Sequence, residues 1–212
     1  MFRSGGEVDG WLGDVIDDAG GDAQVVSLID SVDRMDDDPH WWQDPRNAMR
    51  AVEAIRAALT QADPAGAVDY ARNARAYIGR LRAADAAIAR CWAGVPPAER
   101  QLVTTHDSYG YYARRYGLTV TGSIVDSLSS RGQPSASALA DLVDELRERD
   151  VGAIFTERAL NASVEEAVAR EAGARVETLQ GDALGRGQTY LDALASDTRA
   201  LTVALTGREC GP

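Results

Sequence analysis

The sequence predicts an α/β fold of two lobes linked by a long spine helix, in which the N-terminal lobe is incomplete and the C-terminal lobe is a parallel sheet covered by helices. Three observations support this prediction. A helical pattern runs from Pro64 to about Trp92, roughly 40 Å at 1.5 Å per residue, which is more than a compact small domain needs. Beyond it, strand and helix patterns alternate, as they do in parallel sheets. The segment before it contains a single strand pattern, and one strand cannot form a sheet alone.

Residues 1–63 are expected to be the remnant of an N-terminal lobe. Apolar residues at helical spacing predict a helix that ends at Gly20, and the stretch "AQVVSL" (23–28) predicts a short strand. Asp44 suits an N-cap and Pro45 suits the first helical position, so another helix is expected to begin there. Either this segment folds onto the second lobe, or the first lobe lacks its N-terminal strands.

Residues 64–93 are expected to form the linking helix, and residues 94–212 a complete C-terminal α/β lobe. The strand patterns of this lobe lie at 101–106, 118–124, 151–156 and 174–179, and its helix patterns at 109–117, 136–149, 163–173 and 189–206. Ser135 is a predicted N-cap, and Ser163 with Glu166 forms a predicted capping box. The stretch 129–134 is a predicted loop.

The charge balance limits the classes of partner. The net charge is -11 and the pI is about 4.6, whereas a nucleic-acid-binding protein normally carries a basic patch, so no nucleic-acid partner is expected. The same charge disfavours anionic membranes and favours encounter with small cations. No apolar run reaches membrane-spanning length, and the first residues lack the basic and apolar pattern of a signal peptide.

Cys91 and Cys210 are the two cysteines, and their spacing fits neither a CxxC motif nor a zinc finger. A disulfide formed in an oxidising compartment and two unpaired thiols are equally open possibilities.

Two histidines and one aspartate stand where a ligand site is expected. His106 ends a predicted strand and Asp182 lies just past the last one, and ligands bind beyond the carboxyl ends of strands in open α/β sheets. His40, within "DDDPHWWQDPRN" (36–47), precedes a helix of the first lobe. Two imidazoles and a carboxylate suit Zn²⁺, or Mn²⁺ if oxygen ligands add to the shell.

Each of these residues also has an ordinary structural explanation. His40 in a polar turn can be solvated, His106 can be a core or surface residue, and Asp182 can be a turn residue. If a metal ion is bound, the neighbouring Asp38 and Asp107 are expected to accept the second ring N–H of a histidine and fix its tautomer. The sequence lacks HExxH and GxSxG motifs. A zinc-dependent hydrolase that uses the same three residues remains an alternative, because three protein ligands leave a position for water.

Several segments together resemble one family, the solute-binding proteins of zinc and manganese ABC transporters. The matching segments include "DPHWWQDPRNA" (38–48), "TTHDSYGYYARRYGL" (104–118) and "GDALGRGQTYLDALASDTRAL" (181–201), which occur in the order found in the family. The likeness extends over nearly the whole chain from about residue 4. It implies two α/β lobes joined by a rigid helix, with the metal ion in the cleft between them.

The resemblance implies that His40, His106 and Asp182 are metal ligands and that the protein is not an enzyme. It implies a monomer that captures a divalent ion, zinc first and manganese second, and delivers it to a membrane ABC permease. The location would be extracytoplasmic, either periplasmic or as a surface lipoprotein of the adhesin type. The family pattern also carries a signal peptide and a first ligand histidine upstream of the matched region, so an N-terminal truncation with weakened binding is expected. A manganese-specific receptor and a fragment that binds no metal are the other possibilities.

Overall fold

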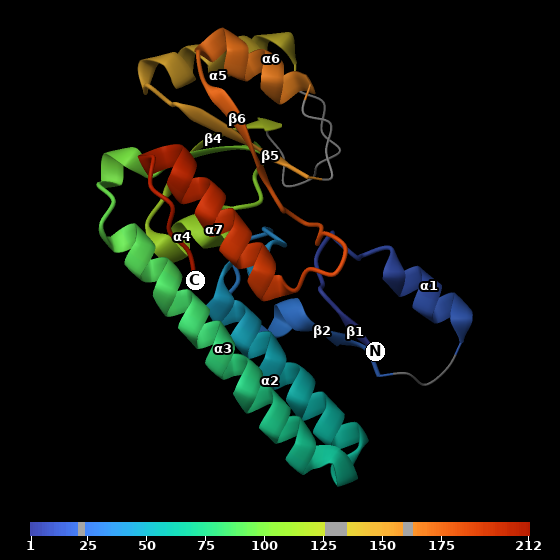
Figure 1. Cartoon of the computed structure of the whole chain (residues 1–212). Coiled ribbons are helices and arrows are strands. Elements are labelled where there is room, and N and C mark those ends of the chain that lie inside the picture. The colour runs from blue at the N-terminus through green and yellow to red at the C-terminus, as the bar shows by residue number, and fades with distance from the viewer. Residues whose placement is uncertain (21–23, 126–134, 159–162) are drawn as a thin grey trace. The chain divides into compact units, whose positions relative to one another are not determined.

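The computed structural model describes residues 1–20, 24–125, 135–158 and 163–212 (Figure 1). The chain divides into two compact units, Met1–Asp85 and Ala86–Pro212, and the boundary falls within one continuous helix, α3 (Ala67–Ala93). The predicted loop at 129–134 lies outside the described residues. Among the described helices, none combines the length and the apolar character needed to cross a membrane.

The first unit contains a small parallel sheet. Strand β1 (Phe2–Arg3) pairs with β2 (Val26–Ser27), and α1 (Leu12–Ala19) lies between them in the sequence. The sequence predicted β2 but not β1, because a strand of two residues is too short for a periodic pattern to reveal it. This segment therefore does form a sheet, although a minimal one.

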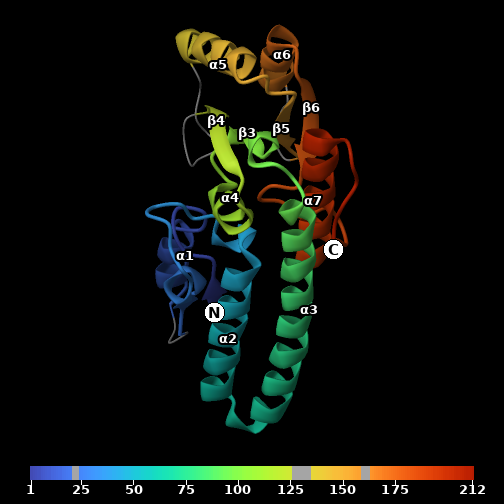
Figure 2. The same cartoon turned by 90° about the vertical axis from the view of Figure 1, so that its left-hand side faces the viewer.

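Two 3-10 helices, η1 (Leu28–Ser31) and η2 (Trp41–Gln43), lead into α2 (Pro45–Ala62). The predicted start of α2 is confirmed, because the side chain of Asp44 accepts a hydrogen bond from the backbone N–H of Arg46. A short 3-10 helix, η3 (Pro64–Gly66), then joins α2 to α3. Helix α2 and the first part of α3 lie side by side as a hairpin (Figures 1 and 2).

The second unit is built on a four-stranded sheet. All of its strand pairs are parallel, and the spatial order is β4-β3-β5-β6. The strands are β3 (Gln101–His106), β4 (Thr119–Val125), β5 (Ala153–Glu157) and β6 (Arg175–Leu179). The helices that follow these strands are α4 (Gly110–Tyr116), α5 (Ala136–Glu148), α6 (Ser163–Ala172) and α7 (Tyr190–Thr206), and the 3-10 helix η4 (Pro97–Glu99) precedes β3.

These elements confirm the alternating strands and helices predicted from sequence, with boundaries that move by a few residues. Ser135 is the N-cap of α5, as predicted, and its hydroxyl accepts from the backbone N–H of Ala138. Helix α6 begins at Ser163, the first residue of the predicted capping box. Strand β5 extends to Glu157, one residue beyond its predicted end.

The sheet of the second unit is covered by helices on both faces (Figure 2). On one face, α5 and α6 pack against apolar residues of the strands, with Leu146 and Ile154 at the centre of this core. On the other face, α4, α7 and the last turns of α3 pack around Phe155, Trp92 and Leu201. The predicted fold class is thereby confirmed: an α/β protein with a long helix and a parallel sheet between helical layers.

A disulfide joins Cys91 in α3 to Cys210 near the C-terminus, across a sequence separation of 119 residues. Residues around Cys210 are further held by α7, because the Thr202 hydroxyl donates to the Cys210 carbonyl and accepts from its backbone N–H. Of the two possibilities left open by the sequence, the structure contains the disulfide.

Candidate metal centre

The strand register of the second unit brings three polar side chains to one edge of the sheet. Thr104 of β3 pairs with Phe155 of β5, so His106 and Glu157 each stand two residues further along their strands, on the same face. Glu157 in turn pairs with Leu179, the last residue of β6. The segment that carries Asp182 therefore begins next to the end of β5.

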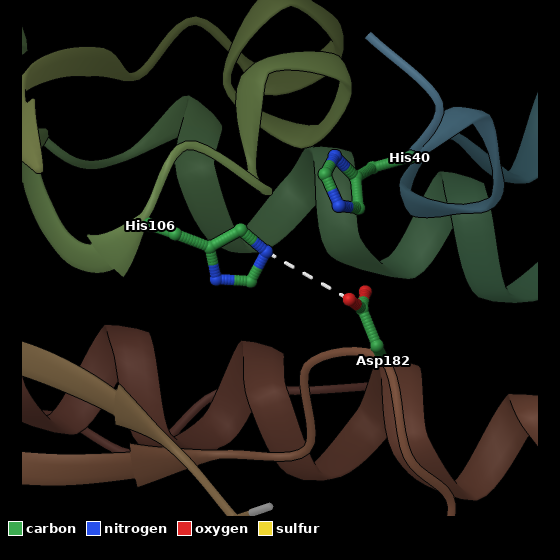
Figure 3. Close-up of side chains that lie close together, drawn as sticks. All are labelled: His40, His106 and Asp182. Carbon is green, nitrogen blue, oxygen red and sulfur yellow. Dashed lines mark ion pairs between the residues drawn. The ribbon is translucent and has the colours of Figure 1, made fainter. Parts of the chain in front are cut away.

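The imidazole of His106 is buried and has a carboxylate at each ring nitrogen. Nδ1 lies 2.7 Å from Oε1 of Glu157, and the Ser108 hydroxyl donates to the same oxygen at 3.0 Å. A carboxylate at Nδ1 favours the proton on that nitrogen and leaves the lone pair of Nε2 available to a metal ion. Nε2 lies 3.7 Å from Oδ2 of Asp182, as the dashed line in Figure 3 marks.

Gly181 allows the Asp182 segment to lie against Glu157. Its φ is +62°, a left-handed conformation that side chains disfavour. A Cβ at this position would also overlap the carboxylate of Glu157. Glycine is therefore required here both by the backbone conformation and by the close approach of Glu157.

The separation of His106 Nε2 and Asp182 Oδ2 suits two ligands of one ion. Two atoms that bind one tetrahedral Zn²⁺ at about 2.0–2.2 Å stand roughly 3.3–3.6 Å apart. The observed 3.7 Å is close to this range and too long for a hydrogen bond between the two atoms. Asp182 is the more exposed partner, with 36% of its side chain accessible, whereas the side chain of His106 is 1% accessible.

His40 belongs to the first unit, where it immediately precedes η2 (Figure 3). Its Nδ1 hydrogen-bonds to Oδ1 of Asp38 at 2.7 Å, and the backbone N–H of His40 donates to the same oxygen at 2.9 Å. The ring also makes an edge contact with Trp42, with centroids 5.4 Å apart. Trp41 packs beside Trp42 and donates from Nε1 to the Ser4 hydroxyl at 3.1 Å.

Both histidines thus have the same local arrangement. Nδ1 lies beside a carboxylate, that of Asp38 for His40 and that of Glu157 for His106, and Nε2 faces away from that carboxylate. The expected partner of His40, Asp38, is the observed one. For His106, the prediction of Asp107 is wrong, because the carboxylate at Nδ1 is Glu157. The predicted strand ended at residue 156, so Glu157 was missed, although its alternation with Ala153 and Phe155 places all three on one face.

A family model described as zinc-uptake complex component A, periplasmic, matches residues 1–204. Among curated proteins, the chain is 29% identical over 205 residues to the manganese-binding lipoprotein MntA of Halalkalibacterium halodurans, a match that spans 92% of this chain and 67% of that protein. It is 31% identical over 174 residues to the high-affinity zinc uptake system protein ZnuA of Bacillus subtilis, spanning 79% of this chain and 53% of that protein.

The chain covers still less of other relatives: 48% of the iron-binding protein YfeA of Yersinia pestis and 33% of the zinc-binding lipoprotein AdcA of Streptococcus pneumoniae. Among solved structures, the laminin-binding protein Lmb of Streptococcus agalactiae matches with a TM-score of 0.79 at 27% identity, over 94% of this chain and 77% of that one. The periplasmic zinc-binding protein TroA of Treponema pallidum shares the fold with a TM-score of 0.87 over 96% of this chain and 79% of that one, at 24% identity.

The family model covers all but the last residues, and the motifs around His40, His106 and Asp182 are those by which the sequence resembles metal receptors. The chain therefore belongs to the family of the periplasmic zinc-uptake component A, the solute-binding proteins of zinc and manganese ABC importers.

Proposed function

We propose that this protein captures a divalent metal ion outside the cytoplasm, with zinc as the preferred ion, and delivers it to the membrane permease of an ABC importer. His40, His106 and Asp182 are the proposed ligands, through Nε2 of each imidazole and a carboxylate oxygen. The observation that carries the proposal is the pairing of His106 Nε2 with Asp182 Oδ2 at 3.7 Å, while Glu157 holds the opposite ring nitrogen.

The donor set supports zinc over manganese. Two imidazole nitrogens and one carboxylate suit Zn²⁺, whereas Mn²⁺ favours shells rich in oxygen. The named relatives include both zinc-binding and manganese-binding proteins, so their names support a divalent ion without selecting one. Three ligands leave one position of a tetrahedral shell for water or for a further ligand.

The proposed location is supported by the disulfide between Cys91 and Cys210, since structural disulfides persist in oxidising compartments such as the periplasm or the cell surface. Relatives described as periplasmic or as lipoproteins agree with it. The proposed partner is a permease that receives the ion from a monomer of this protein.

Zinc titration of the purified protein by calorimetry tests the ligand assignment. His40→Ala, His106→Ala and Asp182→Ala are each expected to weaken zinc binding at least tenfold. Asp37→Ala, which removes an exposed carboxylate from the same acidic turn as Asp38, is the matched control and is expected to bind like the unchanged protein. Wild-type affinity in both histidine variants would refute the site. A parallel titration with Mn²⁺ is expected to give the weaker affinity.

Hydrolytic zinc sites also use three protein ligands and a water, so the zinc-loaded protein should be tested against ester and phosphoester probes. Turnover that disappears in His106→Ala would favour the hydrolase. Zinc-dependent binding to the permease without turnover would favour transport.

A further inference from the structure

A buried carboxylate on α7, Asp197, contacts both segments that carry the proposed ligands of the second unit. Its Oδ2 accepts a hydrogen bond from the Tyr109 hydroxyl at 2.8 Å, and its Oδ1 accepts from the backbone N–H of Gln180 at 2.8 Å. The Tyr109 hydroxyl in turn accepts from the backbone N–H of Gly181 at 3.3 Å. One side chain and one hydroxyl therefore connect two segments that are more than 70 residues apart in the sequence.

These contacts involve residues that lie close in the sequence to the two proposed ligands of the second unit. Tyr109 follows His106 by three residues, and Gln180 precedes Asp182 by two. Strand β6 ends at Leu179, so the backbone beyond it is no longer within the sheet. The hydrogen bonds to Asp197 and Tyr109 thus tie the first two residues of the Asp182 segment to α7 and to the segment after β3.

Water cannot easily replace these contacts. Asp197, Tyr109 and Gln180 are each 5% accessible or less. Leaving a buried donor without its acceptor costs about 1–3 kcal/mol of free energy. The folded protein therefore keeps these hydrogen bonds formed.

We propose that Asp197 is a positioning residue for metal capture, which fixes the separation of His106 and Asp182 before the ion arrives. This inference rests on the proposed function, in which His106 and Asp182 share one ion. Ligands that are already in place lose less conformational entropy on binding, so a preorganised pair binds more tightly than a mobile pair.

The positioning role of Asp197 depends on two hydrogen-bonding atoms in the side chain rather than on its negative charge. Asn at position 197 can accept from the Gln180 N–H through its oxygen and donate to the Tyr109 oxygen through its amide. Ala at this position keeps neither contact. Comparison of Asp197→Asn with Asp197→Ala therefore separates positioning from charge.

The experiment combines zinc titration with amide hydrogen exchange of the metal-free protein, in Asp197→Ala, Asp197→Asn and Tyr109→Phe. Thr198→Val is the matched control, because it removes the neighbouring buried hydroxyl of α7, which bonds to Tyr112 and not to either ligand segment. Asp197→Ala is expected to raise the zinc dissociation constant about 10–100-fold, the usual effect of losing a group that orients metal ligands. It is also expected to speed exchange at Gln180 and Gly181. Asp197→Asn and Thr198→Val are expected to change the constant less than threefold.

The zinc dissociation constant and the rate of amide hydrogen exchange together show whether the positioning role fails alone or the proposed function fails as well. If the unchanged protein binds no zinc, the proposed function is wrong, and the positioning role in metal capture is overturned with it. If it binds zinc and Asp197→Ala keeps both the wild-type constant and wild-type exchange, only the positioning role is overturned. If Asp197→Ala does not fold, Tyr109→Phe decides, because it removes a single hydroxyl: an unchanged constant overturns the proposal, and a raised one supports it.

Discussion

Oε1 of Glu157 lies 2.7 Å from Nδ1 of His106, and both side chains are almost completely buried. The two residues end adjacent parallel strands, so the sheet register itself sets their separation. A buried carboxylate beside an imidazole favours the Nδ1–H tautomer and makes Nε2 a stronger ligand.

Removal of this carboxylate should weaken metal binding without removing a ligand. Glu157→Ala is expected to raise the zinc dissociation constant about 10–100-fold, and Glu157→Gln less, because the amide oxygen can still accept from Nδ1–H. Glu165→Gln is the matched control, since Glu165 is as buried as Glu157 but lies on α6. Isothermal titration with zinc measures all three variants, and equal constants for Glu157→Ala and the control would contradict the role of Glu157.

Asp38 should act on His40 in the same way within the first unit. Its Oδ1 accepts from both the ring and the backbone N–H of His40, so Asp38→Ala removes two hydrogen bonds that hold the imidazole. The expected result is a zinc dissociation constant raised about tenfold or more. Asp37→Ala, one position away and exposed, is expected to leave the constant unchanged. Similar constants for the two variants would mean that Asp38 does not position His40 for metal.

Gly181 should be required for a reason beyond its backbone conformation. Gly181→Ala and Gly187→Ala both place a side chain at a positive φ, which costs roughly 1–2 kcal/mol. Only the Cβ at position 181 meets Glu157, whereas nothing lies within 4 Å of a Cβ at 187. Gly181→Ala is therefore expected to lower the free energy of unfolding more than Gly187→Ala and to weaken zinc binding, and Gly187→Ala to leave binding intact. Urea unfolding and zinc titration of both variants test this, and equal effects would exclude the clash with Glu157.

The sequence predicted the second unit well because its strands are long enough to show a period and its helices begin with capping residues such as Ser135. It could not predict β1, whose two residues carry no period. At the site, the topology of a parallel sheet was enough to bring His106 and Asp182 to one edge. The partners Glu157 and Asp197 were missed because their roles depend on strand register and on the packing of α7, which connect residues far apart in the sequence.

The disulfide should contribute strongly to stability, because it closes a long loop. With a separation of 119 residues between Cys91 and Cys210, the chain-entropy model gives a contribution of roughly 4–5 kcal/mol. The double variant Cys91→Ser/Cys210→Ser is expected to lose about this much free energy of unfolding, measured by urea denaturation. Reductant should destabilise the unchanged protein to a similar extent and have no effect on the double variant. An unchanged urea midpoint in the double variant would contradict the prediction.

Asp197 should also make stability depend on pH in a defined window. Burial raises the pKa of Asp197 from its ordinary value of 3.8 to about 6, and the negative charge of Glu157 adds to this effect, whereas the hydrogen bonds from Gln180 and Tyr109 oppose it. Because the folded-state pKa lies above the unfolded value, the folded protein binds this proton more tightly. The resulting stabilisation is complete below about pH 3.8 and is lost as the pH rises through about 6, a total of about 3 kcal/mol at 1.36 kcal/mol per pH unit.

Asp197→Asn removes this titration but keeps the hydrogen-bonding positions, so it isolates the effect. The free energy of unfolding of the unchanged metal-free protein, minus that of the variant, is expected to fall by about 3 kcal/mol in total from below pH 3.8 to above pH 6, and to stay constant above about pH 7. Titratable groups that do not interact with position 197 cancel in the difference. Urea denaturation at half-unit pH steps in the presence of a chelator measures it. A difference that is constant from pH 3.8 to 7 would show that the pKa of Asp197 in the folded protein is close to that of an exposed aspartate, and it would contradict the prediction.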